Sequence, residues 1–279
     1  MRKCWLNGRC VIITGASGGL GFNIAKILIE KFGCTVYGIA RNKEKMEKNI
    51  STLDDKKHLF HYNLFDVSIK ENWAEYLKFL NENNVKPDIL INNAGFMLPF
   101  MKFEDITEQE IDEIIRVNFL SCIYSIRTLM PLLKKSATPS IINVSSAAGH
   151  CAIVGESMYC ATKSAVRGLT ETLIQDYKKK IYVAGVYPGF IKTDILNRID
   201  DKEKNSKLIE MLMMPVEKAS KKIVKKIKRK KKRIVLGLDG GYMSNFSALM
   251  PKTTPSLVSW VLKTSKIAMF DKLFKEKKQ

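Results

Sequence analysis

Directly after an apolar run at residues 10–13 comes the segment Thr14-Gly15-Ala16-Ser17-Gly18-Gly19-Leu20-Gly21. An amphipathic helical pattern at residues 19–32 follows it. Glycines at a strand-to-helix turn let the backbone approach a pyrophosphate group, which the positive N-terminus of the helix attracts. The turn therefore predicts a dinucleotide site, although a plain tight turn would use the same residues. The residues predicted to bind at this turn are Gly15, Ser17, Gly19, Leu20 and Gly21.

Further apolar segments alternate with longer helical patterns along the chain. We expect strands at residues 10–14, 35–40, 58–65, 88–92, 140–144, 182–187 and 233–236, and helices near 19–32, 43–52, 69–84, 108–135, 157–178 and 216–231. Apolar strands that are each followed by a helix are typical of a parallel sheet covered on both faces. The pattern predicts an α/β fold: a Rossmann-like, doubly wound sheet of about seven parallel strands with helices on both faces, plus a C-terminal helical extension. We place the main domain at residues 1–240 and the extension at 241–279.

The composition is that of a globular protein, with 46% apolar and 27% charged residues in a chain of 279. The longest clear apolar run, Ile181 to Tyr187, has seven residues, whereas a membrane span needs roughly 18. The first nine residues lead directly into the first predicted strand, which leaves no room for a signal peptide. We therefore expect a cytoplasmic protein.

The chain is strongly basic, and the excess is concentrated at one end. The formal net charge is +19, and residues 215–279 hold 18 Lys or Arg against 4 Asp or Glu. Such a block could meet nucleic acid or an anionic membrane, or could be a solvated helix face. Most of the cations are Lys, which lacks the bidentate fork of Arg, and this favours the solvated face over a nucleic-acid partner.

The second predicted strand ends at Arg41, where an NAD site usually has an acid that binds the ribose. A guanidinium can pair with the 2′-phosphate of NADP, and Ser17 can donate a hydrogen bond to the same group. We therefore predict NADP(H) as the preferred cofactor and leave NAD(H) open. The next two strands end at Asp66 and at the segment Asn93-Ala94-Gly95, on the sheet edge where ligands lie in such folds.

Tyr159 and Lys163 lie one turn apart at the start of a predicted helix. A phenol with a pKa of about 10 is a poor base at neutral pH, but a nearby ammonium and an oxidised nicotinamide lower that pKa. Ser146 ends the fifth predicted strand at the same edge, where its hydroxyl can bond the substrate oxygen. Asn118 interrupts an apolar helical stretch, either as a structural amide or as an anchor for a water molecule. The cysteines and histidines show no metal-ligand spacing, so we expect no metal site.

Together these motifs resemble the short-chain dehydrogenase/reductase family over about residues 7–240. The resemblance rests on Thr14, Gly15, Gly19, Gly21, Asp66, the Asn92-Asn93-Ala94-Gly95 segment, Asn118, Ser146, Tyr159, Lys163, Pro188-Gly189 and Thr193. It implies hydride transfer between nicotinamide and a carbonyl or secondary alcohol, with Tyr159 as the general acid/base. Lys163 would lower the pKa of Tyr159 and hold the nicotinamide ribose, and Ser146 would orient the substrate oxygen. Asn118 would hold a water that links Lys163 to solvent.

The resemblance also implies that Pro188, Ile191 and Thr193 contact the nicotinamide end. It suggests a dimer or tetramer through the helices at 108–135 and 157–178, whose apolar faces could equally belong to the core. One position departs from the family. Many NADP-preferring members have a basic residue where this chain has Gly18, so the preference for NADP is expected to be less absolute.

Loops above the strand ends set the substrate in this kind of fold, and three such loops lie at residues 96–101, 147–158 and 189–214. The first loop and the end of the third are rich in Met and Phe, which favours a bulky apolar substrate such as a steroid-like or long-chain keto lipid, although the same side chains could simply close the core. The basic, amphipathic tail at 255–279 fits an anionic membrane surface, a docked helix or a dimer contact. We predict an NADP(H)-dependent oxidoreductase. The alternative is a non-catalytic cofactor-sensing or nucleic-acid-binding module on the same fold.

Overall fold

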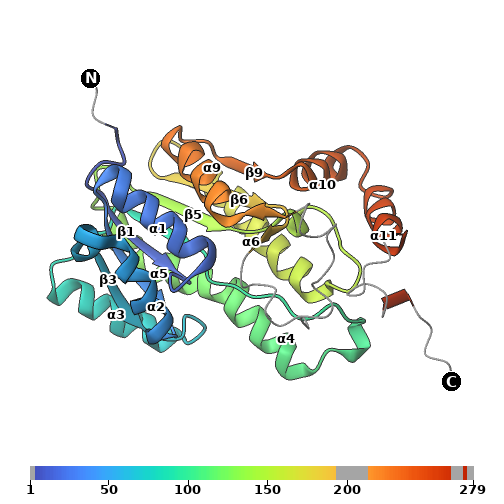
Figure 1. Cartoon of the computed structure of the whole chain (residues 1–279), viewed down its shortest axis with the longest axis horizontal. Helices are drawn as coiled ribbons and strands as arrows, with labels where there is room; N and C mark the ends of the chain where they lie inside the picture. The colour runs from blue at the N-terminus through green and yellow to red at the C-terminus, as the bar shows by residue number, and fades with distance from the viewer. Residues whose placement is uncertain (1–3, 193–212, 265–272, 275–279) are drawn as a thin grey trace.

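A parallel β-sheet runs through the molecule (Figure 1). The computed structural model describes residues 4–192, 213–264 and 273–274. Within these residues the sheet has seven strands: β1 (Cys10–Thr14), β2 (Thr35–Ala40), β3 (Phe60–Leu64), β4 (Ile89–Asn92), β5 (Ser140–Val144), β6 (Tyr182–Pro188) and β9 (Arg233–Leu236). Their spatial order is β3-β2-β1-β4-β5-β6-β9, so the direction of winding reverses between β1 and β4. The predicted doubly wound α/β fold is confirmed.

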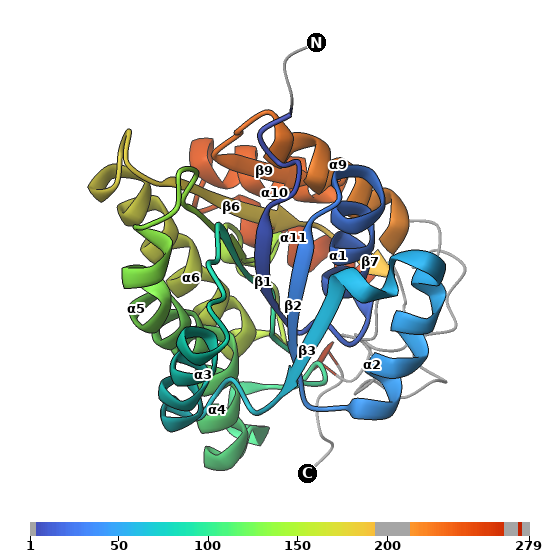
Figure 2. The ribbon, with the colours of Figure 1, turned by 90° about the vertical axis from the view of Figure 1, so that its left-hand side faces the viewer.

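Helices cover both faces of the sheet, as Figure 2 shows. Helices α1 (Gly19–Phe32) and α9 (Val216–Lys228) lie side by side on one face. The other face carries α3 (Lys70–Glu82), α5 (Ser121–Leu133) and α6 (Ser157–Asp176). Each face therefore has its own apolar core. Leu28 of α1 and Ile223 of α9 are buried in one core, and Trp73 of α3 and Leu129 of α5 are buried in the other.

The helix predicted at 108–135 is interrupted. The structure forms α4 (Glu108–Ile115), a π-helical segment at Arg116–Leu120, and then α5. A capping box between Thr107 and Glu110 begins α4. The π-helical segment holds one extra residue per turn and buries Asn118, which explains the polar residue in an otherwise apolar pattern.

Smaller differences from the predicted elements have local causes. Strand β3 begins two residues later than predicted because residues 51–59 form 3₁₀ turns after α2 (Lys43–Ile50). Two short strands, β7 (Ile191–Lys192) and β8 (Met214–Pro215), pair with each other outside the main sheet. Neither was predicted, because two-residue strands have no readable periodicity.

The C-terminal part contains two described helices, α10 (Leu238–Leu249) and α11 (Thr254–Thr264). Helix α11 begins at Thr254-Pro255, with the Pro in its first turn, and α10 runs across residue 240, the predicted limit of the main domain. Leu273 lies against Gly155: a Cβ atom on Gly155 would come within 2.6 Å of Cδ1 of Leu273. None of the helices that the structure describes has both the length and the apolar character to cross a membrane.

A chain of buried polar side chains joins the middle of the sheet to α5 and α6. The Asn92 amide donates to Oδ1 of Asn143 at 2.9 Å, and the Asn143 amide donates to the Thr170 hydroxyl at 2.9 Å. The hydroxyl of Ser125 donates to Oδ1 of Asn92 at 2.6 Å. All four residues are buried, so each bond replaces water that the core excludes. The bonds fix β4 and β5 against the helices on that face.

Replacing Asn143 with Leu should therefore destabilise the fold. The variant leaves the Asn92 amide without its acceptor, and a buried unsatisfied group costs about 1–3 kcal/mol. Urea unfolding followed by circular dichroism measures the change in the free energy of unfolding. Asn81→Leu, at an exposed position of α3, is the control and should change stability by less than about 0.5 kcal/mol. Equal losses in the two variants would contradict the role assigned to the buried chain.

Candidate active site

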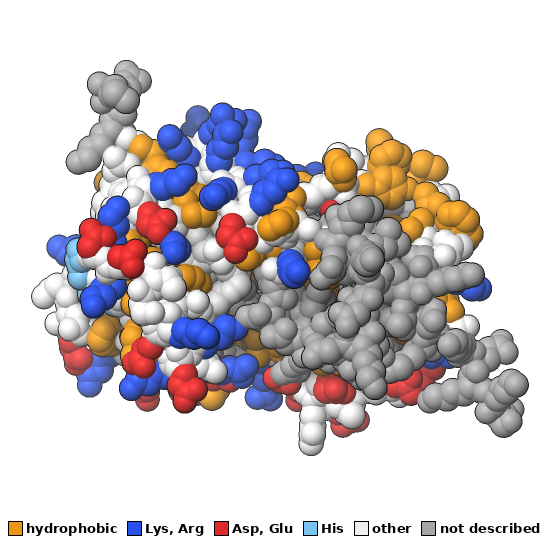
Figure 3. Space-filling model, in the orientation of Figure 1, with side chains coloured by type: hydrophobic (Ala, Val, Ile, Leu, Met, Phe, Trp, Pro, Cys, Tyr) orange, Lys and Arg blue, Asp and Glu red, His pale blue; other side chains and the backbone are white. Residues whose placement is uncertain are grey.

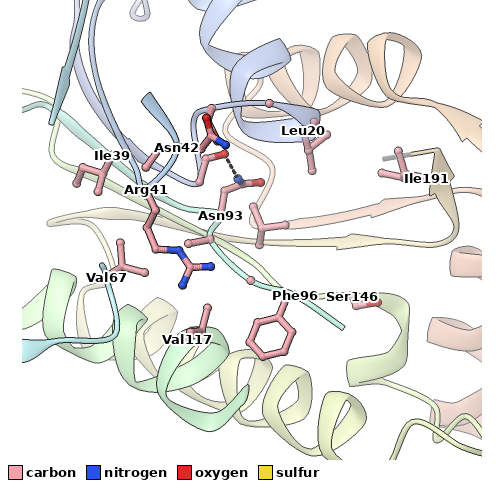
Figure 4. A pocket seen from close by; sticks show the side chains of 18 of the residues that line it. Leu20, Ile39, Arg41, Asn42, Val67, Asn93, Phe96, Val117, Ser146 and Ile191 are labelled. Atoms are coloured by element: carbon pink, nitrogen blue, oxygen red, sulfur yellow. Dashed lines mark hydrogen bonds between the residues drawn. The ribbon is translucent and has the colours of Figure 1, made fainter. Parts of the chain in front are cut away.

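A cavity of about 530 Å³ lies at the carboxyl ends of the central strands, on both sides of the point where the winding reverses (Figure 4). Most of the predicted site residues line it: Gly15, Ser17, Gly19, Leu20, Arg41, Asp66, Asn93, Ala94, Gly95, Ser146, Tyr159, Lys163, Pro188 and Ile191. Gly21 and Asn118 are absent from its lining. Thr193 lies outside the described residues.

The glycine turn between β1 and α1 has no room for side chains at two positions. Gly15 has a φ of +66°, a conformation that favours glycine, and a Cβ there would lie 3.0 Å from Cα of Ala94. A Cβ on Gly21 would lie 2.3 Å from the carbonyl oxygen of Gly15. Gly21 therefore supports the turn by letting α1 pack directly against it. This close approach leaves the backbone of the turn facing the cavity.

Thr14 fastens the glycine turn to the end of β4. Its hydroxyl oxygen accepts hydrogen bonds from the backbone N–H groups of Asn93 at 3.0 Å and Ala94 at 2.9 Å. In return, the Asn93 side-chain amide donates to the carbonyl oxygens of Thr14 at 2.9 Å and Gly15 at 3.2 Å. The side chain of Asn93 is thus used within the protein, and the segment that follows it is held at the cavity wall.

At one end of the cavity Arg41 forms an ion pair with Asp66. Figure 4 shows the Arg41 side chain extending into the cavity from the end of β2, and its Nη1 lies 3.2 Å from Oδ2 of Asp66. Burial raises the pKa of Asp66, but hydrogen bonds from Ser68 and the charge of Arg41 outweigh it, so the pKa is lowered overall. An anionic carboxylate is therefore held beside the only Arg that lines this cavity within the described residues.

Two further residues at this end, Asn42 and Lys45, also line the cavity. Asn42 caps the N-terminus of α2, where its side chain accepts from the backbone N–H of Lys45 at 2.8 Å. The cap places Lys45 in the first turn of α2, four residues after Arg41. Sequence reasoning missed this second cation; a basic residue one helical turn beyond the end of β2 was the available signal.

Tyr159 and Lys163 meet Ser146 at the other end of the cavity. Both Tyr159 and Lys163 lie in the first two turns of α6, and Nζ of Lys163 lies 5.6 Å from the centre of the Tyr159 ring. Ser146, which follows β5, forms a hydrogen bond with Tyr159. Nζ of Lys163 donates to the carbonyl oxygen of Val144 at 3.2 Å. The three predicted catalytic side chains on β5 and α6 are therefore brought together.

Burial has the largest effect on the pKa values of Lys163 and Tyr159. It lowers the pKa of Lys163 to about 8, although the nearby Cys122 acts in the opposite direction. It raises the pKa of Tyr159, and the hydrogen bond with Ser146 offsets this only in part. In the protein alone the pKa of Tyr159 thus moves opposite to the sequence expectation, because desolvation of the phenolate dominates. Tyr159 is a neutral phenol at pH 7.

Asn118 lies behind the cavity wall, where its side chain binds the backbone of Phe96. Its Oδ1 accepts from the Phe96 N–H at 2.8 Å, and its Nδ2 donates to the Phe96 carbonyl oxygen at 2.8 Å. A Cβ on Gly95 would lie 3.1 Å from both Oδ1 of Asn118 and Nζ of Lys163. The π-helical segment therefore brings Asn118 close to Lys163, with Gly95 between them.

A smaller pocket of about 60 Å³ adjoins the cavity and shares Ser146, Tyr159, Gly189 and Ile191 with it. Most of its wall is apolar and comes from the three predicted loops and from α10: Met97, Phe100, Ala147, Ala148, Ile153, Phe190 and Met243. Two acids, Glu156 and Asp239, also line it. Met213 packs against the apolar cluster that includes Met97 and Phe100, whereas residues 211 and 212 lie outside the described residues. Sequence reasoning missed Glu156, for which an acid three residues before Tyr159 was the available signal.

Within the part of the chain that the structure describes, no group of three or more His, Cys, Asp or Glu side chains is arranged to hold a metal ion.

Comparisons with known proteins agree with this geometry. The family model described as short chain dehydrogenase matches residues 9–204. An uncharacterized oxidoreductase of Staphylococcus saprophyticus is 31% identical over 210 residues, covering 73% of this chain and 82% of the relative. An NADPH-dependent pterin aldehyde reductase of Arabidopsis thaliana is 31% identical over 191 residues, covering 67% of this chain and 77% of the relative.

A solved structure extends the likeness to three dimensions. The short-chain dehydrogenase from Sphingobium yanoikuyae, in complex with NADPH, is 25% identical with a TM-score of 0.74, and the match covers 89% of this chain and 94% of that one. The match of the family model over residues 9–204 confirms the resemblance drawn from the motifs. The chain belongs to the short-chain dehydrogenase family of oxidoreductases.

Proposed function

We propose that the chain is an NADP(H)-dependent oxidoreductase that reduces the carbonyl group of a bulky apolar substrate, with Tyr159 as the general acid. The observation that carries this proposal is the meeting of Ser146, Tyr159 and Lys163 where the large cavity joins the smaller apolar pocket. A dinucleotide and a carbonyl compound could then occupy adjoining spaces, with the reacting atoms beside the phenol.

The residues of the cavity fit NADP(H). The glycine turn offers backbone N–H groups at the N-terminus of α1, and its close packing requires that Gly15 and Gly21 carry no Cβ. At the far end, Arg41 and Lys45 supply positive charge for a 2′-phosphate, and Ser17 lies in the same wall. Lys45 thus supplies the second positive charge that many NADP-preferring members have at the position of Gly18. The NADPH in the Sphingobium structure and the NADPH dependence of the Arabidopsis relative support the same cofactor.

The proposed reduction uses each side chain for a separate task. When bound, NADPH supplies a hydride. As the new C–H bond forms at the carbonyl carbon, the carbonyl π bond breaks, and the phenol of Tyr159 gives its proton to the oxygen, so that an alcohol is released. Ser146 donates a hydrogen bond to that oxygen, and the ammonium of Lys163 stabilises the phenolate that remains. The raised pKa of Tyr159 supports this direction, because the phenol carries its proton at neutral pH.

Asn118 is assigned a positioning role. Both atoms of its side-chain amide bind Phe96, so it fixes the backbone beside Gly95 and Lys163. The water that the family resemblance implies at Asn118, the nicotinamide contact of Thr193, the dimer or tetramer and the cytoplasmic location stay predictions. The limits of a main domain at 1–240 and an extension at 241–279 stay a proposal as well.

We further propose that α10 and α11 dock on an anionic membrane, from which an apolar substrate could enter. Among the described residues, most of the large hydrophobic side chains that are exposed lie on or between these helices: Leu238, Phe246, Leu249, Met250, Leu257, Trp260 and Val261. Figure 3 shows an apolar surface over α10 and α11, on the same side of the molecule as the lysines over α9. Apolar side chains next to lysines are typical of proteins that lie on anionic lipid.

Replacing Tyr159 with Phe should lower turnover by about 10²–10⁴-fold while leaving NADPH affinity unchanged, because only the transferable proton is removed. The loss of NADPH absorbance with a panel of aromatic and alicyclic ketones measures turnover, and NADPH fluorescence measures binding. Tyr177→Phe, at the other end of α6, is the control. Undiminished turnover in the Tyr159 variant would refute the assignment.

Replacing Arg41 with Asp should lower the affinity for NADPH by about tenfold to a hundredfold and the affinity for NADH far less. The reason is that the new acid repels the 2′-phosphate, which only NADPH carries. Fluorescence titration of both cofactors gives the two dissociation constants. Lys43→Asp, whose lysine is absent from the cavity lining, controls for the change in net charge. Equal losses for the two cofactors would exclude a phosphate role for Arg41.

The double variant Leu257→Ser/Trp260→Ser should bind anionic vesicles at least about tenfold more weakly than the wild type, because it removes two exposed apolar side chains. Flotation with vesicles of phosphatidylcholine and phosphatidylserine measures this binding. Phe103→Ser, which removes an exposed ring outside α10 and α11, should bind as the wild type does. If the double variant instead changes the oligomeric state in light scattering, the surface is a contact between copies.

A further inference from the structure

Glu156 is buried in the smaller pocket, which it lines together with Tyr159. The residue is 3% exposed and stands at the N-terminal boundary of α6, one turn before Tyr159. Its carboxyl oxygen Oε1 is buried and has no hydrogen-bond partner among the described residues. Buried polar groups are nearly always hydrogen-bonded, so this exception points to a partner from outside the chain.

The other acid of the same pocket makes a clear contrast. Asp239 accepts a hydrogen bond from the backbone N–H of Phe190 at 2.6 Å, so its carboxylate holds the loop that follows β6. Glu156 holds no such loop: its side chain does not cap α6. Its own backbone is satisfied separately, because its N–H donates to Ile153 at 3.2 Å and its carbonyl accepts from Cys160 at 2.8 Å. The carboxyl group is therefore available to a ligand in the pocket.

Glu156 also lies within reach of the reaction. It lines the smaller pocket together with Ser146 and Tyr159. A substrate whose reacting oxygen lies between Ser146 and Tyr159 must extend into this pocket, whose other walls are mostly apolar. The atoms near the reacting carbon are then the ones that Glu156 can touch.

We propose that Glu156 is a specificity-determining residue that binds a second, uncharged oxygen of the substrate, a hydroxyl or carbonyl near the reacting carbon. The proposal rests on the proposed reductase function and narrows its substrates from apolar ketones to apolar hydroxyketones or diketones.

The character of the second group follows from the state of the acid. Burial raises the pKa of Glu156 well above its usual range, which favours the neutral acid. A neutral carboxyl group both donates and accepts, so it suits a hydroxyl or a carbonyl oxygen. An ammonium group would instead need an ionised Glu156 and a buried ion pair in an apolar wall, which carries a large desolvation cost.

Binding of a matched pair of product-like alcohols to the complex with NADPH tests the assignment without turnover. The pair is 1-phenyl-1,2-propanediol and 1-phenyl-1-propanol, and calorimetry gives both dissociation constants. The wild type should bind the diol about tenfold or more tightly than the mono-alcohol, since the mono-alcohol leaves a buried acid unpaired. Glu156→Leu should reduce this ratio to about one, and Glu156→Gln, which keeps a donor and an acceptor, should retain most of it.

A merely structural role for Glu156 would change the affinity for both alcohols and the melting temperature, but not the ratio. An equal ratio in the wild type and the Leu variant overturns the proposal, as does a wild type with no preference for the diol. Tighter binding of 2-amino-1-phenyl-1-propanol than of the diol also overturns it, in favour of an ionised acid. Reduction of 1-phenyl-1,2-propanedione by the wild type, with Tyr159→Phe as the blank, separately tests the reductase function.

Discussion

The hydroxyl of Thr14 holds together the two halves of the sheet at the point where the ligand cavity opens. One oxygen accepts the backbone N–H groups of Asn93 and Ala94, so the end of β4 is fixed to the end of β1. These two bonds join the glycine turn to the segment that ends at Gly95. Gly95 packs closely against Asn118 and Lys163, because a Cβ at position 95 would lie 3.1 Å from Oδ1 of Asn118 and from Nζ of Lys163. The glycine turn and the proposed catalytic Lys163 are thus linked through the short segment at residues 93–95. A side chain at position 14 that cannot accept these hydrogen bonds would free that segment from β1.

The fold and most of this cavity could be predicted from the sequence because parallel sheets impose strong local patterns. Buried strands are apolar along their length, and the residue after each strand falls on one edge of the sheet, so Arg41, Asp66 and Ser146 could be assigned to a common site. The prediction was weakest where an element departs from regular periodicity. The sequence around Asn118 predicts an ordinary α-helix. The inserted residue of the π-helical segment changes which side chains face the core, but it does not change the composition. The two-residue strand that begins at Ile191 has no pattern at all.

Electrostatics were predicted less well than positions, since burial is a property of the folded chain. The sequence places Tyr159 beside Lys163, and the spacing alone suggests a lowered phenol pKa. In the structure both groups are buried. Desolvation favours the neutral form of each, so it raises the pKa of Tyr159 and lowers the pKa of Lys163. The same region buries Glu156, an acid that looks like an ordinary loop residue in the sequence. Glu156 and Tyr159 share the apolar wall of the smaller pocket, and Lys163 lines the large cavity beside Tyr159, so a charged ligand that binds there shifts the pKa values of all three.

Helix α10 connects this wall to the surface of the molecule. At its start Asp239 holds the backbone of Phe190, and farther along Met243 forms part of the pocket wall. One and two turns beyond Met243 the same helix exposes Phe246 and Leu249. A helix of three turns moves as one unit, so a partner or lipid surface that shifts its exposed side chains also moves the loop that lines the pocket. The proposed docking surface and the substrate pocket therefore share one rigid element. Occupancy of either one is expected to bias the position of the other.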